Sequence, residues 1–166
     1  MILSVQHSSI LDDRTPLYSY LGFLFFGNQL REKICERGRE GWVIFMDVDH
    51  LDQIRLDYGL KTAQAVLHSV GLAIREIFPA PAVAARLDAD EFVILLPAPE
   101  ESEEVLLSRF NKALKKQVSN MQFRFPITVA VGIARSGIGD SFDLHELLRT
   151  AAWKAIDQKP HRKAKF

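Results

Sequence analysis

Two hydrophobic periodicities alternate along the chain and predict a domain that combines helices with strands. Apolar residues recur at helical spacing through residues 62–78, and the segments at 51–58, 101–118 and 144–158 are also predicted as helices. Short apolar runs bounded by polar residues or prolines are typical of buried strands. The predicted strands cover residues 42–47, 83–86, 92–96 and 127–134.

A further helix is predicted near the N-terminus from its capping residues. Thr15 and Pro16 suit the N-cap and the first helical position, and Gly38 suits the C-terminal stop just after residue 37. This helix is apolar on nearly every side, which a single buried stripe does not require. We interpret the additional apolar residues as a surface that packs on another subunit or protein. The alternative is that they are simply buried inside the domain. Its apolar residues are Leu17, Tyr18, Tyr20, Leu21, Phe23, Leu24, Phe25 and Phe26.

The order of predicted elements indicates the fold class. Helix, strand, helix, helix, strand, strand, helix, strand and helix follow one another, which predicts an α/β or α+β domain with a mixed sheet and a central β-hairpin. No strand is followed by a glycine-rich phosphate loop, so neither a P-loop nor a dinucleotide-binding fold is supported. We divide the chain into a lead-in segment at residues 1–13 and one domain at residues 14–166.

Composition narrows the classes of partner. The chain has 166 residues, and its 21 Lys and Arg balance its 21 Asp and Glu, which argues against DNA or another general polyanion as ligand. Cys35 is the only cysteine, which excludes an internal disulfide and a multi-cysteine zinc site. The densest apolar run, at residues 21–26, is far shorter than the ~20 residues that span a bilayer. With no signal peptide pattern, we expect a cytoplasmic protein without membrane contact.

Acidic residues gather at two places that the fold could join. Asp47 and Asp49 follow the first strand, and Asp88, Asp90 and Glu91 occupy the hairpin turn. If the two strands are neighbours, Asp47 and Asp90 can share one hard cation, since Mg²⁺ takes one or two carboxylates together with water and phosphate oxygens. Acids at strand ends are also commonly solvated turn residues, so spacing alone leaves both interpretations open.

The stretch at residues 86–92, Arg-Leu-Asp-Ala-Asp-Glu-Phe, resembles the GGDEF motif of diguanylate cyclases. Residues 45–51 resemble the strand–acid–helix segment of that family, and residues 129–134 resemble its late strand. The resemblance runs from about residue 12 to residue 163. It implies a ferredoxin-like sheet with helices on its faces, related to nucleotidyl-cyclase and polymerase palm domains. The family's enzymes join two GTP molecules into cyclic di-GMP, with each half-site on one subunit of a dimer. Further matching positions are Thr15, Leu17, Phe23, Ile54, Tyr58, Gly59, Leu147, Leu148 and Ala151.

The resemblance implies an intact metal half of the site. Asp47 matches the family's first metal acid, and the carbonyl of Val48 lies beside it. Asp90 matches the second metal acid, and Glu91 matches the acid that follows it. In an active enzyme Asp90 and Glu91 would be the catalytic residues, and Mg²⁺ would be the cofactor.

The nucleotide half departs from the family pattern. Lys159 matches a phosphate-contacting lysine, but Lys163 stands where the family has an arginine. Asp52 stands where the family has a phosphate-binding lysine, which reverses the charge. Arg55 replaces a guanine-reading asparagine, and Gln64 replaces a guanine-reading aspartate. A glutamine amide offers one acceptor and one donor group, so it cannot accept from both the N1 and N2 donors of guanine.

Asp88 and Ala89 replace the two glycines of the motif. Glycine adopts positive φ easily, whereas Ala89 in a left-handed conformation would cost roughly 1 kcal/mol. The carboxylate of Asp88 would also repel a triphosphate. Pro79 and Ala82 stand at the positions of the family's Arg-x-x-Asp product-inhibition site, so we expect no inhibitory site.

These departures favour a degenerate GGDEF domain in cyclic di-GMP-type signalling. We expect it to be catalytically impaired, to act as a regulatory or protein-interaction module, and to retain binding of GTP or a related nucleotide with Mg²⁺. A protein partner or a homodimer through the first helix would fit this role. One alternative is a weakly active diguanylate cyclase, or a cyclase with altered base preference, because the amide of Gln64 can pair with adenine. Another is a structural domain in which the metal acids have no remaining function.

Overall fold

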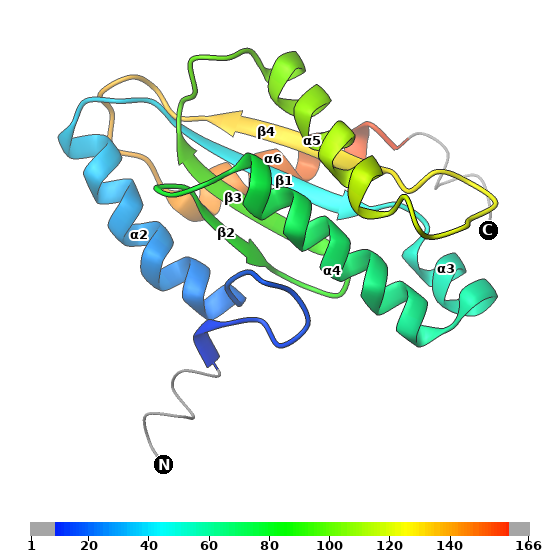
Figure 1. Cartoon of the computed structure of the whole chain (residues 1–166). Helices are drawn as coiled ribbons and strands as arrows, with labels where there is room; N and C mark the ends of the chain where they lie inside the picture. Colours follow the sequence, from blue (N-terminus) through cyan, green and yellow to red (C-terminus); the bar gives the residue numbers. More distant parts are fainter. Residues whose placement is uncertain (1–8, 160–166) are drawn as a thin grey trace.

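The computed structural model describes residues 9–159, which form four strands covered by helices (Figure 1). The helices and strands have the bounds α2 (Tyr20–Glu36), β1 (Gly41–Val48), α3 (Leu51–Tyr58), α4 (Leu60–Ile77), β2 (Val83–Arg86), β3 (Glu91–Pro97), α5 (Glu103–Gln117), β4 (Val129–Arg135) and α6 (Leu144–Asp157). Among these residues no helix is both long enough and apolar enough to cross a membrane.

The strands form one sheet in the order β2-β3-β1-β4, with helices between β1 and β2 and between β3 and β4. This is the ferredoxin-like arrangement, so the predicted α+β class and the central hairpin are confirmed. The expectation of a mixed sheet was wrong in one respect, because all three strand pairings are antiparallel. Within residues 9–159, parallel pairing occurs only as an isolated bridge between Tyr18 and Ala85.

Helices cover both faces of the sheet, α4 and α5 on one face and α2 and α6 on the other (Figure 1). Successive residues of β1 therefore enter different cores. Ile44 and Met46 pack with α4 and α5, whereas Val43 and Phe45 pack with α2 and α6. Burial on both sides explains why β1 is apolar from Gly41 to Met46 with no polar alternation.

Helix α2 begins later than its sequence predicts. Ser19 is the N-cap, and its Oγ accepts from the backbone N–H of Gly22 at 3.2 Å. The predicted N-cap, Thr15, lies in the preceding loop. The chain there is held away from helical geometry because the N–H of Tyr18 donates to the carbonyl of Ala84 in β2 at 3.1 Å. Pairing with the sheet therefore overrides a local capping signal.

Helix α2 is only partly covered by the domain. Phe23 is fully buried and Leu30 and Ile34 join the same core, but Leu21 and Phe25 are 53% and 56% exposed. Simple burial accounts for one face of the helix and leaves an apolar stripe facing outward. The exposed stripe keeps the helix available as an interaction surface.

Candidate functional site

The antiparallel pairing of β1 and β3 brings the two acidic segments together. Asp47 lies opposite Glu91 in the register, and the backbone N–H of Val48 donates to the carbonyl of Asp90 at 2.9 Å. The two strands are therefore neighbours, which is the condition for Asp47 and Asp90 to share a cation. We call this group (Asp47, Asp49, Asp88, Asp90 and Glu91) the acidic edge. Asp47 is its buried member, at 8% exposure.

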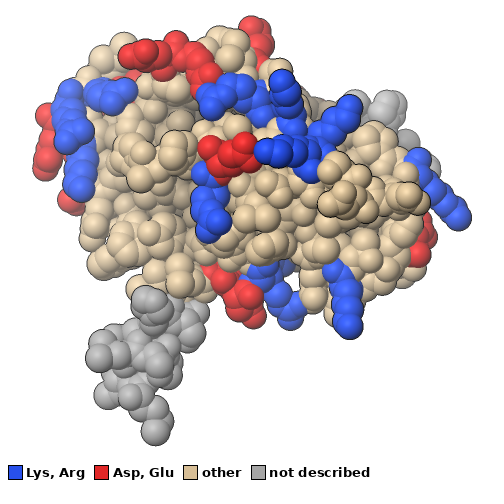
Figure 2. Space-filling view, viewed as in Figure 1, with Lys and Arg blue, Asp and Glu red and all other residues tan. Residues whose placement is uncertain are grey.

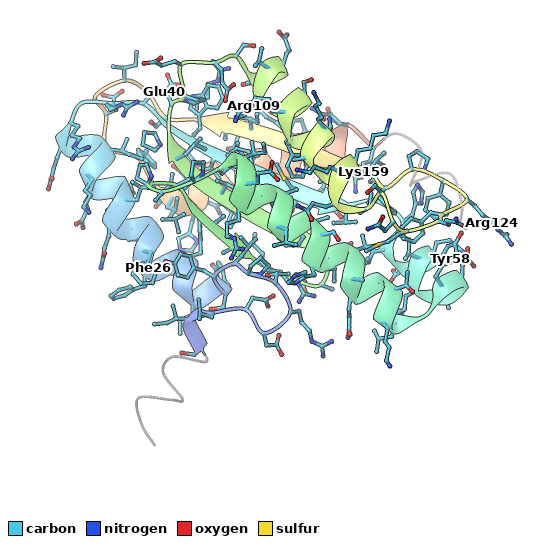
Figure 3. All side chains as sticks on the ribbon, in the orientation of Figure 1. Phe26, Glu40, Tyr58, Arg109, Arg124 and Lys159 are labelled. Atoms are coloured by element: carbon cyan, nitrogen blue, oxygen red, sulfur yellow. The ribbon has the colours of Figure 1, made fainter. Side chains whose placement is uncertain are left out.

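A lysine from the far end of the chain completes the acidic edge. Lys159 follows α6 (Figure 3), and its Nζ lies 3.0 Å from Oδ2 of Asp47 and 2.9 Å from Oδ1 of Asp49. Asp49 is fixed in turn by Thr128, whose Oγ1 donates to Oδ2 of Asp49 at 2.8 Å. The resemblance singled out Lys159 as a phosphate contact, but no spacing in the sequence indicated that it bridges two carboxylates.

The acidic edge carries more negative charge than its lysine offsets. Burial raises the pKa of Glu91 above its ordinary value, and the carboxylates of Asp90, Asp47 and Asp88 raise it further. Lys159 acts in the opposite direction. Repulsion among carboxylates is the electrostatic condition under which a bound cation is favoured.

The residues of the acidic edge fit a magnesium ion. Among residues 9–159 no three His, Cys, Asp or Glu side chains are grouped as a complete metal site. Mg²⁺ does not need such a cage, because it keeps several waters and uses one or two carboxylates with phosphate oxygens. The ammonium of Lys159 lies 3.0 Å from Oδ2 of Asp47, so this carboxylate is already paired with one positive charge.

The turn between β2 and β3 closes without glycine. Among the described non-glycine residues only His50 has positive φ, so Ala89 does not adopt the left-handed conformation expected for it. The expected strain of Ala89 is therefore absent. Instead, Nε and Nη2 of Arg86 donate to the carbonyls of Asp88 at 3.1 Å and Ala89 at 2.9 Å. Oδ1 of Asp88 also accepts from the N–H of Ala89 at 2.8 Å.

Arg86 is held from its other side by the segment that precedes α2. Its Nη1 lies 3.6 Å from Oδ2 of Asp12, and both side chains are largely buried. The same oxygen accepts from the N–H of Thr15 at 2.9 Å and from its Oγ1 at 2.8 Å. Sequence reasoning assigned no role to Arg86, whereas Asp12 is of a residue type that suits caps and turns. The Asp-x-x-Thr spacing, typical of a side chain that caps a turn, was the available signal for Asp12.

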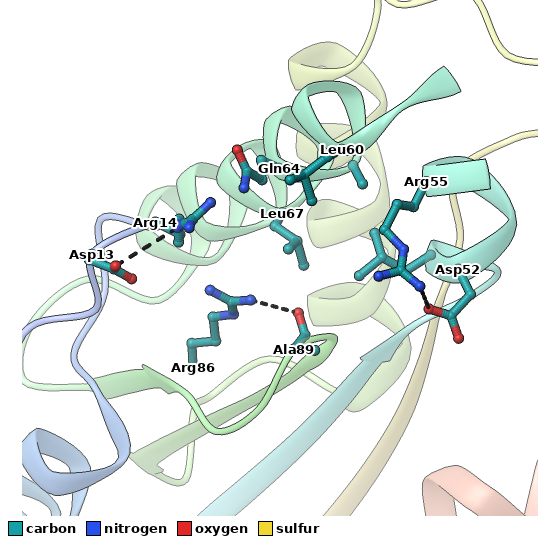
Figure 4. Close-up of a pocket in the computed structure, with 11 residues that line it drawn as sticks. Asp13, Arg14, Asp52, Arg55, Leu60, Gln64, Leu67, Arg86 and Ala89 are labelled. Carbon is teal, nitrogen blue, oxygen red and sulfur yellow. Dashed lines mark hydrogen bonds and ion pairs between the residues drawn. The ribbon is translucent and has the colours of Figure 1, made fainter. Parts of the chain in front are cut away.

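A pocket of about 390 Å³ lies beside the turn, between α3, α4 and the loop before α2 (Figure 4). It brings together Asp52, Arg55, Gln64 and Ala89, which the resemblance had assigned to the nucleotide. The sequence analysis did not anticipate its remaining polar wall, Asp13, Arg14 and Arg86. Its apolar wall consists of Leu51, Leu60, Ala63 and Leu67.

Charged groups in this pocket are partly paired with their neighbours. Arg55 lies 3.6 Å from the exposed carboxylate of Asp52 on the same helix. Nε of Arg14 lies 3.8 Å from the carboxylate of Asp13. Figure 4 shows that Arg14, Arg55 and Arg86 come from three separate elements, so the pocket has cationic groups on several sides.

Other residues named from the sequence lie elsewhere. Lys159 lines a separate hollow of about 480 Å³ beside β4, and Asp88 is on the exposed turn outside the residues that line the first pocket. Pro79 and Ala82 lie at the opposite end of β2 from the turn, where the N–H of Ala82 donates to the carbonyl of Pro79 at 3.1 Å. Lys163 lies outside the described residues.

The face that carries α4 and α5 bears both signs of charge. Lys and Arg side chains are interspersed with Asp and Glu over this surface (Figure 2).

At the end of α3, the hydroxyl of Tyr58 accepts from the N–H of Arg124 at 2.9 Å (Figure 3), which ties the loop before β4 to this helix.

Curated relatives share part of their length with this chain. The bifunctional diguanylate cyclase/cyclic di-GMP phosphodiesterase MucR of Pseudomonas aeruginosa is 33% identical over 114 residues, which is 66% of this chain and 16% of MucR. The biofilm architecture maintenance protein MbaA of Vibrio cholerae is 29% identical over 110 residues, which is 60% of this chain and 14% of MbaA. The chain thus spans less than a fifth of the length of either relative.

Solved structures share the fold. The coiled coil and GGDEF domain of DgcB from Caulobacter crescentus, in complex with c-di-GMP, has a TM-score of 0.78 at 22% identity, over 98% of this chain and 86% of DgcB. Diguanylate cyclase SiaD from Pseudomonas aeruginosa, in complex with its activator SiaC, has a TM-score of 0.75 at 21% identity, over 98% of this chain and 62% of SiaD. The family model described as "Diguanylate cyclase, GGDEF domain" matches residues 9–165. This chain therefore belongs to the GGDEF domain family.

Proposed function

We propose that the chain is a catalytically impaired GGDEF domain of cyclic di-GMP signalling. In this role it binds a purine nucleoside triphosphate with Mg²⁺ and acts on a protein partner. Its family membership and the names of its relatives support the signalling context. The single observation that carries the proposal is the contrast between the two halves of the site. The acidic edge keeps both carboxylates that the resemblance matches to metal acids, whereas the neighbouring pocket carries Asp52, Arg55 and Gln64 in place of the residues that the resemblance implies.

The acidic edge would supply the metal half. Asp47, the carbonyl of Val48 and Asp90 would hold Mg²⁺, which neutralises negative charge on a bound triphosphate. Glu91 lies opposite Asp47 in the strand register and would help to attract the cation. Lys159 already supplies one positive charge at this edge.

The pocket would supply the nucleotide half, with reduced selectivity for guanine. Its apolar wall suits a purine ring, and its arginines suit phosphate or carbonyl oxygens. The two carboxylates of its lining, Asp13 and Asp52, each lie within 4 Å of a neighbouring arginine. Gln64 is the one amide in the lining and offers mixed donor and acceptor groups. A base-reading site that leaves guanine donors unpaired loses a large factor in specificity.

A weakly active cyclase is the second candidate, and one observation favours it. The turn closes with Ala89 at negative φ, so the loss of the glycine pair does not strain the backbone here. The remaining arguments for impairment are the other departures from the family pattern, at Asp52, Arg55, Gln64, Asp88 and Lys163. These are changes in charge and hydrogen bonding, which a different substrate geometry or base could accommodate.

The regulatory half of the proposal rests on α2. Leu21 and Phe25 form an exposed apolar stripe on this helix, which suits a protein partner or a second copy of the chain. SiaD was solved with its activator, which shows that a protein of the same fold can take a protein partner.

The decisive experiment measures turnover and binding together. The chain is incubated with GTP or ATP and Mg²⁺, and cyclic and linear dinucleotides are sought by mass spectrometry. We expect no appreciable product, but a rise in unfolding temperature with nucleotide and Mg²⁺ that Asp90→Asn removes. Product that disappears in Asp90→Asn would establish the cyclase alternative. Neither product nor stabilisation by any nucleotide would leave a structural role.

A further inference from the structure

Lys159 is placed as a resident counterion rather than as a free surface lysine. Only 11% of its side chain is exposed, and its ammonium nitrogen is out of contact with solvent. Its backbone N–H donates to the carbonyl of Ile156 at 3.0 Å, which anchors the residue to the end of α6. A lysine is seldom buried to this extent unless it is paired with acids.

The acids that receive this ammonium are held in place independently of it. Asp47 belongs to β1 and is paired with both neighbouring strands. Asp49 is hydrogen-bonded to Thr128 twice, through its backbone N–H at 2.9 Å and through its side chain at 2.8 Å. The backbones of both acids are therefore fixed by the fold, and both carboxylates lie within 3.0 Å of the same ammonium group.

We propose that Lys159 is an internal cation that competes with a divalent metal for Asp47, so that metal binds only when this ammonium moves away. The inference deepens the proposed function, since it rests on Asp47 as a metal ligand. Two cations on one carboxylate repel each other strongly at such short range. Lys159 thus stabilises the domain without metal and weakens its affinity for metal by the same interaction.

The test measures binding of Mn²⁺ to the whole chain by titration of its free electron paramagnetic resonance signal. Lys159→Met removes the charge and keeps the length of the side chain, and Lys159→Arg keeps the charge. Lys154→Met is the matched control, because its Nζ on the same helix contacts the carbonyl of Ile133 at 2.9 Å. We expect Lys159→Met to bind Mn²⁺ at least about tenfold more tightly than the wild type, and both other variants to bind like the wild type.

Thermal unfolding gives an independent readout. Without metal, Lys159→Met should unfold at a lower temperature than the wild type, because Asp47 and Asp49 lose their counterion. Added Mn²⁺ should raise its unfolding temperature by more than it raises that of the wild type. Asp47→Asn in the Lys159→Met background should abolish the gain in Mn²⁺ affinity.

A measurement on the wild type covers the case in which Lys159→Met does not fold. Acylation of lysines by a soluble anhydride, followed by mass spectrometry, reports whether Mn²⁺ exposes the amine of Lys159, with Lys154 as internal reference. Faster labelling of Lys159 with Mn²⁺ supports the proposal. Equal or weaker Mn²⁺ binding by folded Lys159→Met, or unchanged labelling at saturating Mn²⁺, overturns it and leaves the proposed function standing. If neither protein binds Mn²⁺, the metal-binding part of the proposed function fails as well.

Discussion

Replacing Arg86 with methionine tests whether a guanidinium has taken over the closure of the motif turn. The backbone hydrogen bonds between Asp88 and Glu91 are long, at 3.5 and 3.4 Å. The two bonds that Arg86 donates to the carbonyls of Asp88 and Ala89 are shorter, at 3.1 and 2.9 Å. Removing the guanidinium should therefore loosen the turn more than it loosens the strands beside it.

The magnitude follows from what each group loses. A hydrogen bond to a charged group contributes about 1.5–3 kcal/mol, so two such bonds set the upper limit. The turn is exposed, so water can hydrogen-bond to the two carbonyls when the guanidinium is removed, and the loss is smaller than this limit. The carboxylate of Asp12 keeps its two hydrogen bonds from Thr15, so it does not lose all its partners. We expect a loss of about 1–2 kcal/mol, or roughly 2–8 °C in unfolding temperature for a domain of this size.

Two assays and two controls make this prediction decisive. Thermal unfolding measures the global loss, and hydrogen exchange should be faster at the turn amides than in β1. Arg86→Lys keeps the charge near Asp12 but cannot reach two carbonyls with a planar fork, so it should restore only part of the loss. Arg75→Met removes an exposed arginine of α4 and should change little. The reasoning is wrong if Arg86→Met and Arg75→Met unfold alike and exchange at the turn is unchanged.

Four other changes test the acidic edge, the packing of β4, and the buried and exposed faces of α2. Glu91→Gln should stabilise the domain at neutral pH and not below pH 4.5. The pKa of Glu91 is raised in the folded state, so the stability that its protonated carboxyl contributes is fully present below its ordinary pKa and is lost as the pH rises through its folded pKa. Denaturation measured across a series of pH values checks this. Gly132→Ala should lower the free energy of unfolding, measured by urea denaturation, by about 3 kcal/mol or more, because the new Cβ would lie 1.9 Å from the carbonyl oxygen of Ala151. Phe23→Ala should lower the free energy of unfolding by about 3–5 kcal/mol in the same assay, because this side chain is fully buried. Phe25→Glu should leave the free energy of unfolding nearly unchanged, because this side chain is exposed. If α2 is an interface, Phe25→Glu should also lower the oligomeric mass measured by light scattering.

The periodicity of apolar residues was sufficient to locate most of the elements. The strand predicted at 42–47 is observed as β1 (Gly41–Val48), and the helix predicted at 51–58 is observed as α3 with the same bounds. The strand β1 could be predicted because it is covered on both faces and is therefore apolar. The helix α3 could be predicted because Gly59, whose φ is +93°, ends it.

The start of α2 and the conformation of the turn could not be predicted in the same way. Both depend on contacts between residues far apart in the sequence. The start of α2 depends on the pairing of Tyr18 with β2, and the turn depends on Arg86 and through it on Asp12. A local rule assigns Thr15 to a cap and Ala89 to a strained conformation, since it has no access to these partners.

In the candidate site too, the acidic residues could be named from the sequence, whereas the contacts that they make could not. The spacing of the acids left open whether the segments of Asp47 and Asp90 meet, and the pairing of β1 with β3 brings these segments together. The bridge from Lys159 to Asp47 and Asp49 depends on how the end of α6 packs against the sheet, and no spacing along the chain reports that. The roles of the remaining site residues stay predictions for the experiments above.

If the acidic edge binds a metal ion as proposed, its electrostatics would separate metal binding from catalysis. Burial and three neighbouring carboxylates raise the pKa of Glu91, so the native state confines charges that the unfolded chain would keep apart. Lys159 relieves only part of this repulsion. A divalent cation at the same edge must stabilise the fold, because a ligand that binds only the native state shifts unfolding toward it. Altered base contacts at Arg55 and Gln64, in the separate pocket, leave that gain intact. A domain that turns over no GTP would therefore still respond to Mg²⁺, and its unfolding temperature rather than its product would report the response.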